Sequence, residues 1–402
     1  MTCNRYKELE IIGKDIIDAT TKLYNIKTFD EDEINNIYQE IKSKLIETKI
    51  LSPDRILLAI RTAGICRNKY LSSYLALFKK VTEEYHPEQM KSQSKAYMFT
   101  VYKDYDILAF VSTPEKLENE DTKNYGLDVH ENNTIYKAIK DDDIVSFIGF
   151  TERDGFDENQ RLISLLYPVS KDGYSLLELC CYHGSVKCFK LLRTKFKSAI
   201  TQTCLQFSFL GGNPDIMSEC LKEVQPDNYK CMEYAIISHN IDFVTFLMNT
   251  YNMKVYAKAC AINNNLQAFF VFLDQTTDIN TCFINSASFN IPSICEYFLS
   301  LGADINTKTH DDLDFPALHM ALEFDNFETA EFLISHGIDI NAKATRGINA
   351  LQFSASFSSK EVVEFLVLHG IDTKEKTLEG NDAIHYAAIG NNIKDVWISP
   401  IH

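Results

Sequence analysis

The sequence has few of the residues that interrupt helices, with nine prolines and fifteen glycines among 402 residues. This scarcity argues against long flexible linkers and favours helices. Long hydrophobic stretches are also missing, since the densest apolar run, "FFVFL" at 269–273, is far too short to span a bilayer. The first residues, "MTCNRYKELE", carry charges where a secretion signal requires an apolar stretch, so we expect no such signal.

An excess of positive charge is lacking as well, and so is any pairing pattern among the cysteines. The net charge is −16 and the isoelectric point is about 5.1, so we expect no nucleic-acid partner and no membrane association. The eleven cysteines form no CxxC pair and no disulfide-like framework. Reduced thiols are the simplest explanation. We therefore expect a cytoplasmic protein, with the nucleus as the alternative location.

A period of 33 residues organises the C-terminal part of the chain. Leu318, Leu351 and Ile384 begin the segments "LHMALEF", "LQFSASF" and "IHYAAIG" and are spaced 33 residues apart. Such a length predicts a short helix, a tight turn, a second helix and an extended loop in each unit. The glycines that follow each second helix, Gly302, Gly337 and Gly370, are expected to adopt the left-handed C-cap conformation.

These segments, together with "LGADINTK" at 301–308, resemble ankyrin repeats. The resemblance implies an all-α solenoid of stacked helix pairs. Upstream, shorter units of 25 to 28 residues lack room for a projecting hairpin and are expected to have a tight connection instead. In each of the nine units that we place, a small residue follows three positions after the start, as close helix packing requires: Ala138, Cys180, Ser208, Ala235, Cys260, Ser286, Ala321, Ser354 and Ala387.

The N-terminal third differs from the units. Apolar residues at helical spacing predict amphipathic helices over residues 5–50, and Ser52 with Pro53 marks the start of another. The arrangement is similar to a divergent family of ankyrin proteins expanded in a flagellated parasitic protist, with a helical region, an ankyrin-like module of unknown function, then conventional repeats. We accordingly divide the chain into a helical region at 1–130, short divergent repeats at 134–300, and conventional repeats at 301–402.

The last unit is expected to be incomplete. Its second helix should begin near Ile393, but Pro400 allows at most about two turns. We interpret this end as a truncated or mis-spliced version of a longer array.

Two histidines occupy the position directly after the helix-start residue, namely His319 and His385. In ankyrin repeats this imidazole usually bonds to the backbone of neighbouring loops, so the resemblance implies a structural role. Gln352 stands between them and can make similar hydrogen bonds.

The densest group of possible metal ligands is Cys180, Cys181, His183 and Cys188. A zinc site needs four converging ligands, whereas Cys180 occupies a small packing position and His183 is expected to be exposed. We favour buried structural thiols over a metal site. No nucleotide-binding or hydrolase motif is present, and we expect neither an enzyme nor a cofactor.

The predicted function is a non-catalytic scaffold that binds a protein partner, with no small-molecule substrate. The acidic chain favours partners with a basic patch. An alternative is an adaptor whose N-terminal helices recruit an enzyme complex. For Leu313 and Leu378, contact with a partner and packing on the adjacent hairpin both remain open. The candidate contact residues lie on the hairpin tips: Lys308, Asp311, Leu313, Lys343, Arg346, Lys376 and Leu378.

Overall fold

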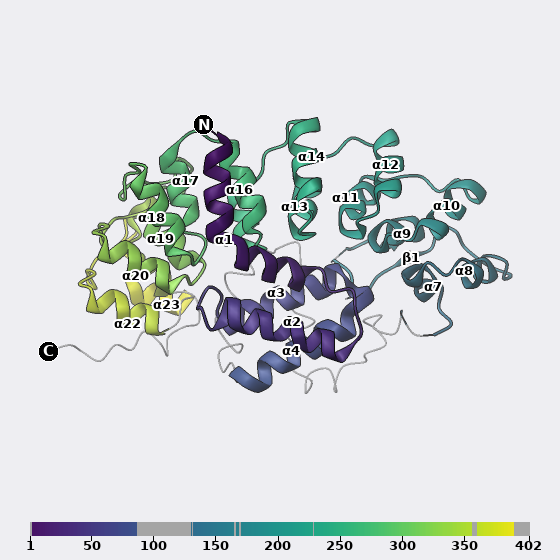
Figure 1. Cartoon of the computed structure of the whole chain (residues 1–402), viewed down its shortest axis with the longest axis horizontal. Coiled ribbons are helices and arrows are strands. Elements are labelled where there is room, and N and C mark those ends of the chain that lie inside the picture. Colours follow the sequence, from purple (N-terminus) through teal and green to yellow (C-terminus); the bar gives the residue numbers. More distant parts are fainter. Residues whose placement is uncertain are drawn as a thin grey trace.

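The chain forms a curved array of helix pairs, with four N-terminal helices packed along it (Figure 1). The computed structural model describes residues 2–86, 130, 132–164, 166–168, 170–227, 229–355 and 360–389. The expectation for the second helix of the last unit concerns residues outside this part of the chain. Within the described residues the architecture is all-α apart from an isolated β-bridge between Lys308 and Pro316 and a pair of two-residue antiparallel strands, β1 (Arg161–Leu162) and β2 (Tyr174–Ser175).

Each of the first eight units contributes a first helix and a second helix, and the described part of the ninth unit contributes a first helix. The first helices are α7 (Ile135–Asp141), α9 (Leu176–His183), α11 (Gln202–Gly211), α13 (Lys230–Ile237), α15 (Ala257–Ile262), α17 (Ile279–Ser286), α19 (Ala317–Glu323), α21 (Ala350–Ala355) and α23 (Ala383–Ile389). The second helices are α8 (Ile144–Thr151), α10 (Val186–Lys195), α12 (Pro214–Glu223), α14 (Ile241–Tyr251), α16 (Leu266–Asp274), α18 (Pro292–Ser300), α20 (Phe327–Ser335) and α22 (Lys360–Leu368).

The connections between units follow the predicted difference in unit length. In the short units the link is tight, as residues 275–278 between α16 and α17 show, whereas residues 301–316 form a long loop between α18 and α19. Pro214 and Pro292 each begin a second helix, where the missing N–H has no helical acceptor to lose.

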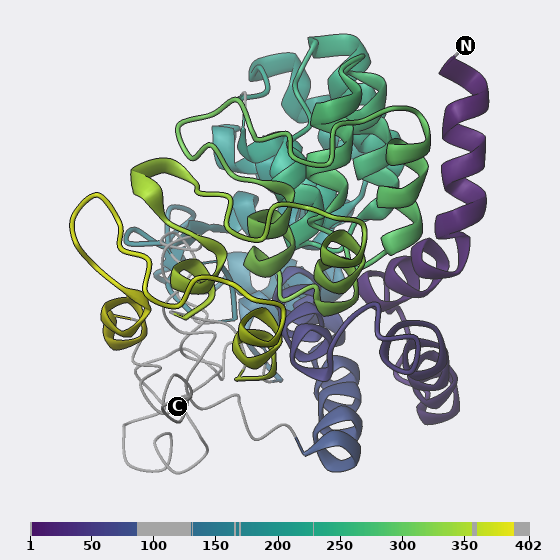
Figure 2. The ribbon, with the colours of Figure 1, turned by 90° about the vertical axis from the view of Figure 1, so that its left-hand side faces the viewer.

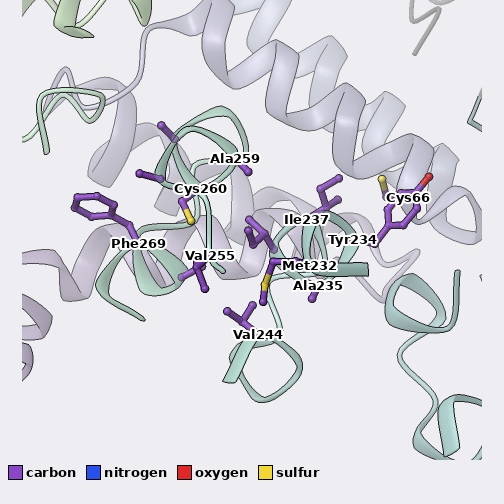
Figure 3. Packing of buried hydrophobic residues seen from close by; sticks show 14 of the residues in the cluster. Cys66, Met232, Tyr234, Ala235, Ile237, Val244, Val255, Ala259, Cys260 and Phe269 are labelled. Carbon is purple, nitrogen blue, oxygen red and sulfur yellow. The ribbon is translucent and has the colours of Figure 1, made fainter. Parts of the chain in front are cut away.

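The core of the array lies between successive first helices and the second helices beside them. All nine small residues at the third position after each start are buried, with at most 3% of their surface exposed. Figure 3 shows part of this core, with Met232 and Ala235 of α13 beside Val244 of α14. At the ninth unit Ala387 stays buried, whereas the start residue Ile384 is 66% exposed. Among the described residues no helix follows α23 to cover it.

Helices α9 and α11 approach most closely where α11 ends. A Cβ atom on Gly211 would lie 2.1 Å from the carbonyl oxygen of Cys181. The contact is with backbone, so a larger residue would force the two helices apart. Glycine is therefore required here by packing.

The N-terminal helices are α1 (Thr2–Tyr24), α2 (Glu31–Ile41), α3 (Pro53–Cys66) and α4 (Leu71–Tyr85). A π-helical turn at Lys42–Ile46 continues α2, and a 3₁₀ turn at Asn68–Tyr70 precedes α4. Ser52 accepts a hydrogen bond from the N–H of Arg55 and caps α3, as the sequence predicts. The four helices share a hydrophobic cluster of their own that includes Leu23 and Leu77.

Two arginines attach this region to the edge of the array where first helices end. The Arg55 guanidinium donates to the carbonyl oxygens of Ala261 and Phe324, each at 3.3 Å. Arg67 donates to the carbonyl oxygen of Ser238 at 3.2 Å. These carbonyls lie at the C-terminal ends of α15, α19 and α13, which carry partial negative charge. The carbonyl oxygen of Ala261 also accepts the N–H of Asn264 at 3.1 Å. Arginine thus caps helices in units distant from it in sequence.

Apolar contacts reinforce this attachment. Leu9 of α1 and Cys66 of α3 belong to the hydrophobic cluster of the array rather than to that of the N-terminal helices. Gly13 lies so close to α16 that an added Cβ would be 2.5 Å from Leu266 Cδ2. In Figure 3, Cys66 lies beside Tyr234 of α13. The N-terminal helices are therefore packed on the array through a continuous apolar contact.

Gly211→Ala should destabilise the protein, because its new methyl group meets backbone across the α9–α11 contact. We expect a loss of roughly 1–3 kcal/mol in the free energy of unfolding, the usual cost of overpacking. Denaturant unfolding of the purified protein measures this. Gly149→Ala is the matched control, since Gly149 is in α8 and a Cβ there would meet no atom within 4 Å. This control should gain about 0.5–1 kcal/mol from its higher helix propensity, and equal effects of both changes would contradict the packing described.

Candidate functional site

Three hairpin tips form a regular row along one side of the array. They comprise residues 308–315, 343–347 and 376–380, and backbone hydrogen bonds join consecutive tips. The N–H of Thr345 donates to the carbonyl oxygen of Leu313, and the N–H of Leu378 donates to that of Arg346, both at 2.9 Å. These two bonds are related by the 33-residue period, so the tips form one continuous surface.

Ion pairs within the row involve most of the predicted contact cations. Lys308 Nζ lies 3.3 Å from Asp314 and donates to the carbonyl oxygen of Lys343 at 2.8 Å. Lys343 pairs with Glu375 at 2.8 Å, and Arg346 pairs with Glu379 at 3.4 Å. Because these side chains are partly or fully exposed, each pair contributes little stability.

Two predicted contact residues behave differently from these. Asp311 accepts hydrogen bonds from Thr309 Oγ1 at 2.7 Å and from the N–H of Leu313 at 3.0 Å, so it holds the first tip in shape. Lys376 is exposed and forms no ion pair with the residues that the structure describes.

Leu313 and Leu378 are the apolar residues of the row. Leu313 is 45% exposed and Leu378 is 85% exposed. Leu378 borders the neighbouring tip, since its Cγ lies 3.6 Å from where a Cβ on Gly347 would be, yet this contact covers little of it. The exposure favours contact with a partner over packing on the adjacent hairpin, most clearly for Leu378.

His319 is buried between Phe315 and Phe353 and is 1% exposed. Its Nε2 lies 3.1 Å from the carbonyl oxygen of Ile348, which belongs to the loop of the next unit. Burial lowers the pKa of His319 to about 4. The imidazole is therefore neutral at pH 7 and links two successive units.

Gln352 makes the equivalent link one unit later. Its Nε2 donates to the carbonyl oxygens of Glu375 at 2.7 Å and Asn381 at 3.3 Å. His385 differs, since it is exposed and its Nδ1 lies 2.7 Å from Asp382 within its own helix start. The shared sequence position therefore gives a buried link at two units and a surface contact at the third.

The three glycines predicted as helix caps adopt left-handed conformations. Gly302, Gly337 and Gly370 have φ angles of 93°, 84° and 84°. The following N–H bonds back to the helix in each case, as in the 3.1 Å bond from Ile338 to the carbonyl oxygen of Leu333. This is the Schellman pattern, which ends the second helix and sets the direction of the loop.

The cysteine-rich segment of α9 and α10 has no metal-site geometry. Cys180, Cys181 and Cys188 are fully buried, and burial raises the pKa of the Cys180 thiol well above its usual value. The described residues contain no group of three or more possible ligands arranged to hold a metal ion. The expectation that His183 is exposed is wrong: it is half-buried, and its Nε2 lies 2.7 Å from the Tyr167 hydroxyl oxygen.

Among the described residues, no helix is both long enough and apolar enough to cross a membrane.

Two family models match the chain. A domain of unknown function (DUF3447) matches residues 196–272, and ankyrin repeats (3 copies) match residues 257–344. No curated protein matches the chain. The chain thus combines that domain of unknown function with ankyrin repeats, and its fold is an all-α ankyrin-repeat array.

Acid should destabilise the protein partly through His319. The pKa of His319 is about 4 in the folded protein and about 6.5 in the unfolded chain. Between these values the unfolded chain binds a proton that the folded protein does not. The free energy of unfolding is therefore unaffected by His319 above pH 6.5 and decreases as the pH falls towards 4. The shift corresponds to about 3 kcal/mol. His319→Gln, which copies the amide of Gln352, should retain folding and show a smaller loss of unfolding free energy between pH 7 and pH 4.5. The exposed His310→Gln is the control, and an unchanged pH dependence in His319→Gln would contradict the inference.

Proposed function

We propose that this protein is a non-catalytic scaffold that binds a protein partner through its row of hairpin tips. Ankyrin repeats generally mediate protein–protein interaction, and the match at residues 257–344 includes the first tip. The three tips form one surface because backbone hydrogen bonds align them. Leu378 supplies an apolar contact, and charged residues surround it, as at many interfaces.

This proposal rests on one observation: the hairpin tips and the N-terminal helices lie on different sides of the array. Figure 2 shows the loops of the last repeats projecting on one side, with α1 on the opposite side. The N-terminal helices contact the turns where first helices end, through Arg55 and Arg67. The tip row is therefore left uncovered by the N-terminal helices.

The partner that suits this surface has a basic patch next to an apolar pocket. The chain carries a net charge of −16, which steers positively charged proteins towards it. Leu378 would enter the pocket and lose its exposure to water. We also propose that the chain divides into a helical region at 1–130, short divergent repeats at 134–300 and conventional repeats from 301. In this division the conventional repeats supply the binding surface.

Leu378→Glu should weaken partner capture from cell extract without affecting folding, because the side chain is exposed in the free protein. A charge placed in an apolar pocket should weaken binding by at least about tenfold. Quantitative affinity capture compares the variant with wild type. Leu368→Glu is the matched control, because Leu368 is 83% exposed at the end of α22 and outside the tip row.

Equal capture by Leu378→Glu and wild type would contradict binding through the tips. Loss of the partner only on changes in the exposed face of α1–α4, such as Leu75→Glu, would favour an adaptor that recruits an enzyme through its N-terminal helices. Leu75 is 48% exposed on α4.

A further inference from the structure

A cleft of about 500 Å³ lies between the N-terminal helices and the turns of the short repeats. One wall comes from the end of α1 and the segment after α3, and the other from the ends of α9, α11 and α13. Pockets of this volume suit small molecules. The tips of the long repeats do not contribute to it, so it is separate from the surface proposed to bind a protein.

The residues that line this cleft carry positive charge, whereas the chain as a whole is negatively charged. Lys27, Arg67 and Lys69 line it, and the residues that line it include no aspartate or glutamate. Lys27 and Lys69 form no ion pair within the described part of the chain. In a chain with a net charge of −16, three cations without a carboxylate around one cleft form a local positive field.

Hydrogen bonds hold the Arg67 side chain in place in the wall of the cleft. Its Nε donates to the carbonyl oxygen of Tyr24 and its Nη2 to Asn25 Oδ1, both at 2.7 Å. Its three acceptors, on Tyr24, Asn25 and Ser238, are neutral oxygens and not carboxylates. The two lysines have flexible side chains that can move to a ligand, which lysine does as a mobile point charge.

The neighbouring histidines reflect the same field. His183 lines the cleft, and its pKa is lowered well below the usual value, chiefly by burial and further by His130, Lys140 and Lys69. Asn240 and Ile241, at the N-terminus of the eleven-residue helix α14, also line the cleft. This helix end is capped by the Asn240 side chain and carries Asp242 in its first turn, so the positive charge of the cleft comes from its lysines and arginine.

The remaining walls are aromatic. Tyr70, Phe209 and Phe243 line the cleft together with amide side chains. A single carboxylate would leave most of the positive charge uncompensated, whereas a phosphate carries about two negative charges at neutral pH. The rings offer contact to an organic group attached to it.

We propose that this cleft binds a small phosphate-bearing molecule, with Lys27 and Lys69 contacting the phosphate. A ligand there would touch both the N-terminal helices and the repeats, and would hold them together. Binding would therefore raise the thermal unfolding midpoint, and the increase would continue to grow with the logarithm of the ligand concentration above the Kd.

Isothermal titration calorimetry with pyrophosphate and with adenosine 5′-diphosphate, at low ionic strength, tests the proposal. Both probes should bind to the wild-type protein and raise its unfolding midpoint. The double variant Lys27→Gln/Lys69→Gln should bind each at least about tenfold more weakly, because charge-assisted hydrogen bonds are lost. Added salt should weaken binding to the wild-type protein.

Lys190→Gln is the matched control, since Lys190 is exposed on α10 and outside the cleft. It should change affinity less than about twofold. Absence of binding by both probes, or equal binding by wild type and the double variant, would overturn the proposal. Binding of a phosphoserine peptide without binding of either small probe would also overturn the proposal, because it would assign the cleft to a protein ligand. Without ligand, the double variant must unfold at the same midpoint as the wild-type protein. If its midpoint is lower, the single variants Lys27→Gln and Lys69→Gln are measured in its place.

Discussion

The close approach of neighbouring first helices is the constraint on which the rest of the structure depends. Each first helix presents a small residue to the next, and all nine of these residues are buried. At Gly211 the approach is so close that a single methyl group would reach the backbone of α9. This spacing aligns the helix ends on one edge of the array and the loops on the other. A contact made by the smallest side chains therefore sets the geometry of both candidate surfaces.

The edge formed by helix ends is a row of carbonyl groups with partial negative charge, and the N-terminal helices supply charged donors to it. Arg55 and Arg67 reach the ends of α13, α15 and α19, while Asn290 of the array donates to the carbonyl oxygen of Lys49 at 2.6 Å. Hydrogen bonds from charged donors to helix C-termini satisfy polar groups that would otherwise need water. The helical region and the array thus share hydrogen bonds as well as a hydrophobic core.

Unit length decides what each part of the array can do. The long units have room for loops whose backbones hydrogen-bond to each other, and these loops carry Leu313 and Leu378. The short units lack such loops, and next to their turns the N-terminal helices leave the cleft around Arg67. A protein partner and a small anion would consequently bind at different places and through different chemistry.

The sequence by itself determined the repeat fold, because stacking imposes a local pattern that recurs. The 33-residue period, the small residues, Pro214, Pro292 and the capping glycines all follow from single helix pairs and their nearest neighbours. A structural role for His319 was expected from its place directly after the helix-start residue, which the ankyrin resemblance implies bonds to neighbouring backbone. In the structure His319 lies 3.1 Å from the carbonyl oxygen of Ile348, and Gln352 donates to the corresponding carbonyl of Asn381. Only the tertiary structure decided how the N-terminal helices attach, which side of the array they leave open, and that Lys27, Arg67 and Lys69 line one cleft. The physical reason is that their partners are backbone carbonyls and residues far along the chain. Any residue can supply a carbonyl, so such contacts leave no pattern in the sequence.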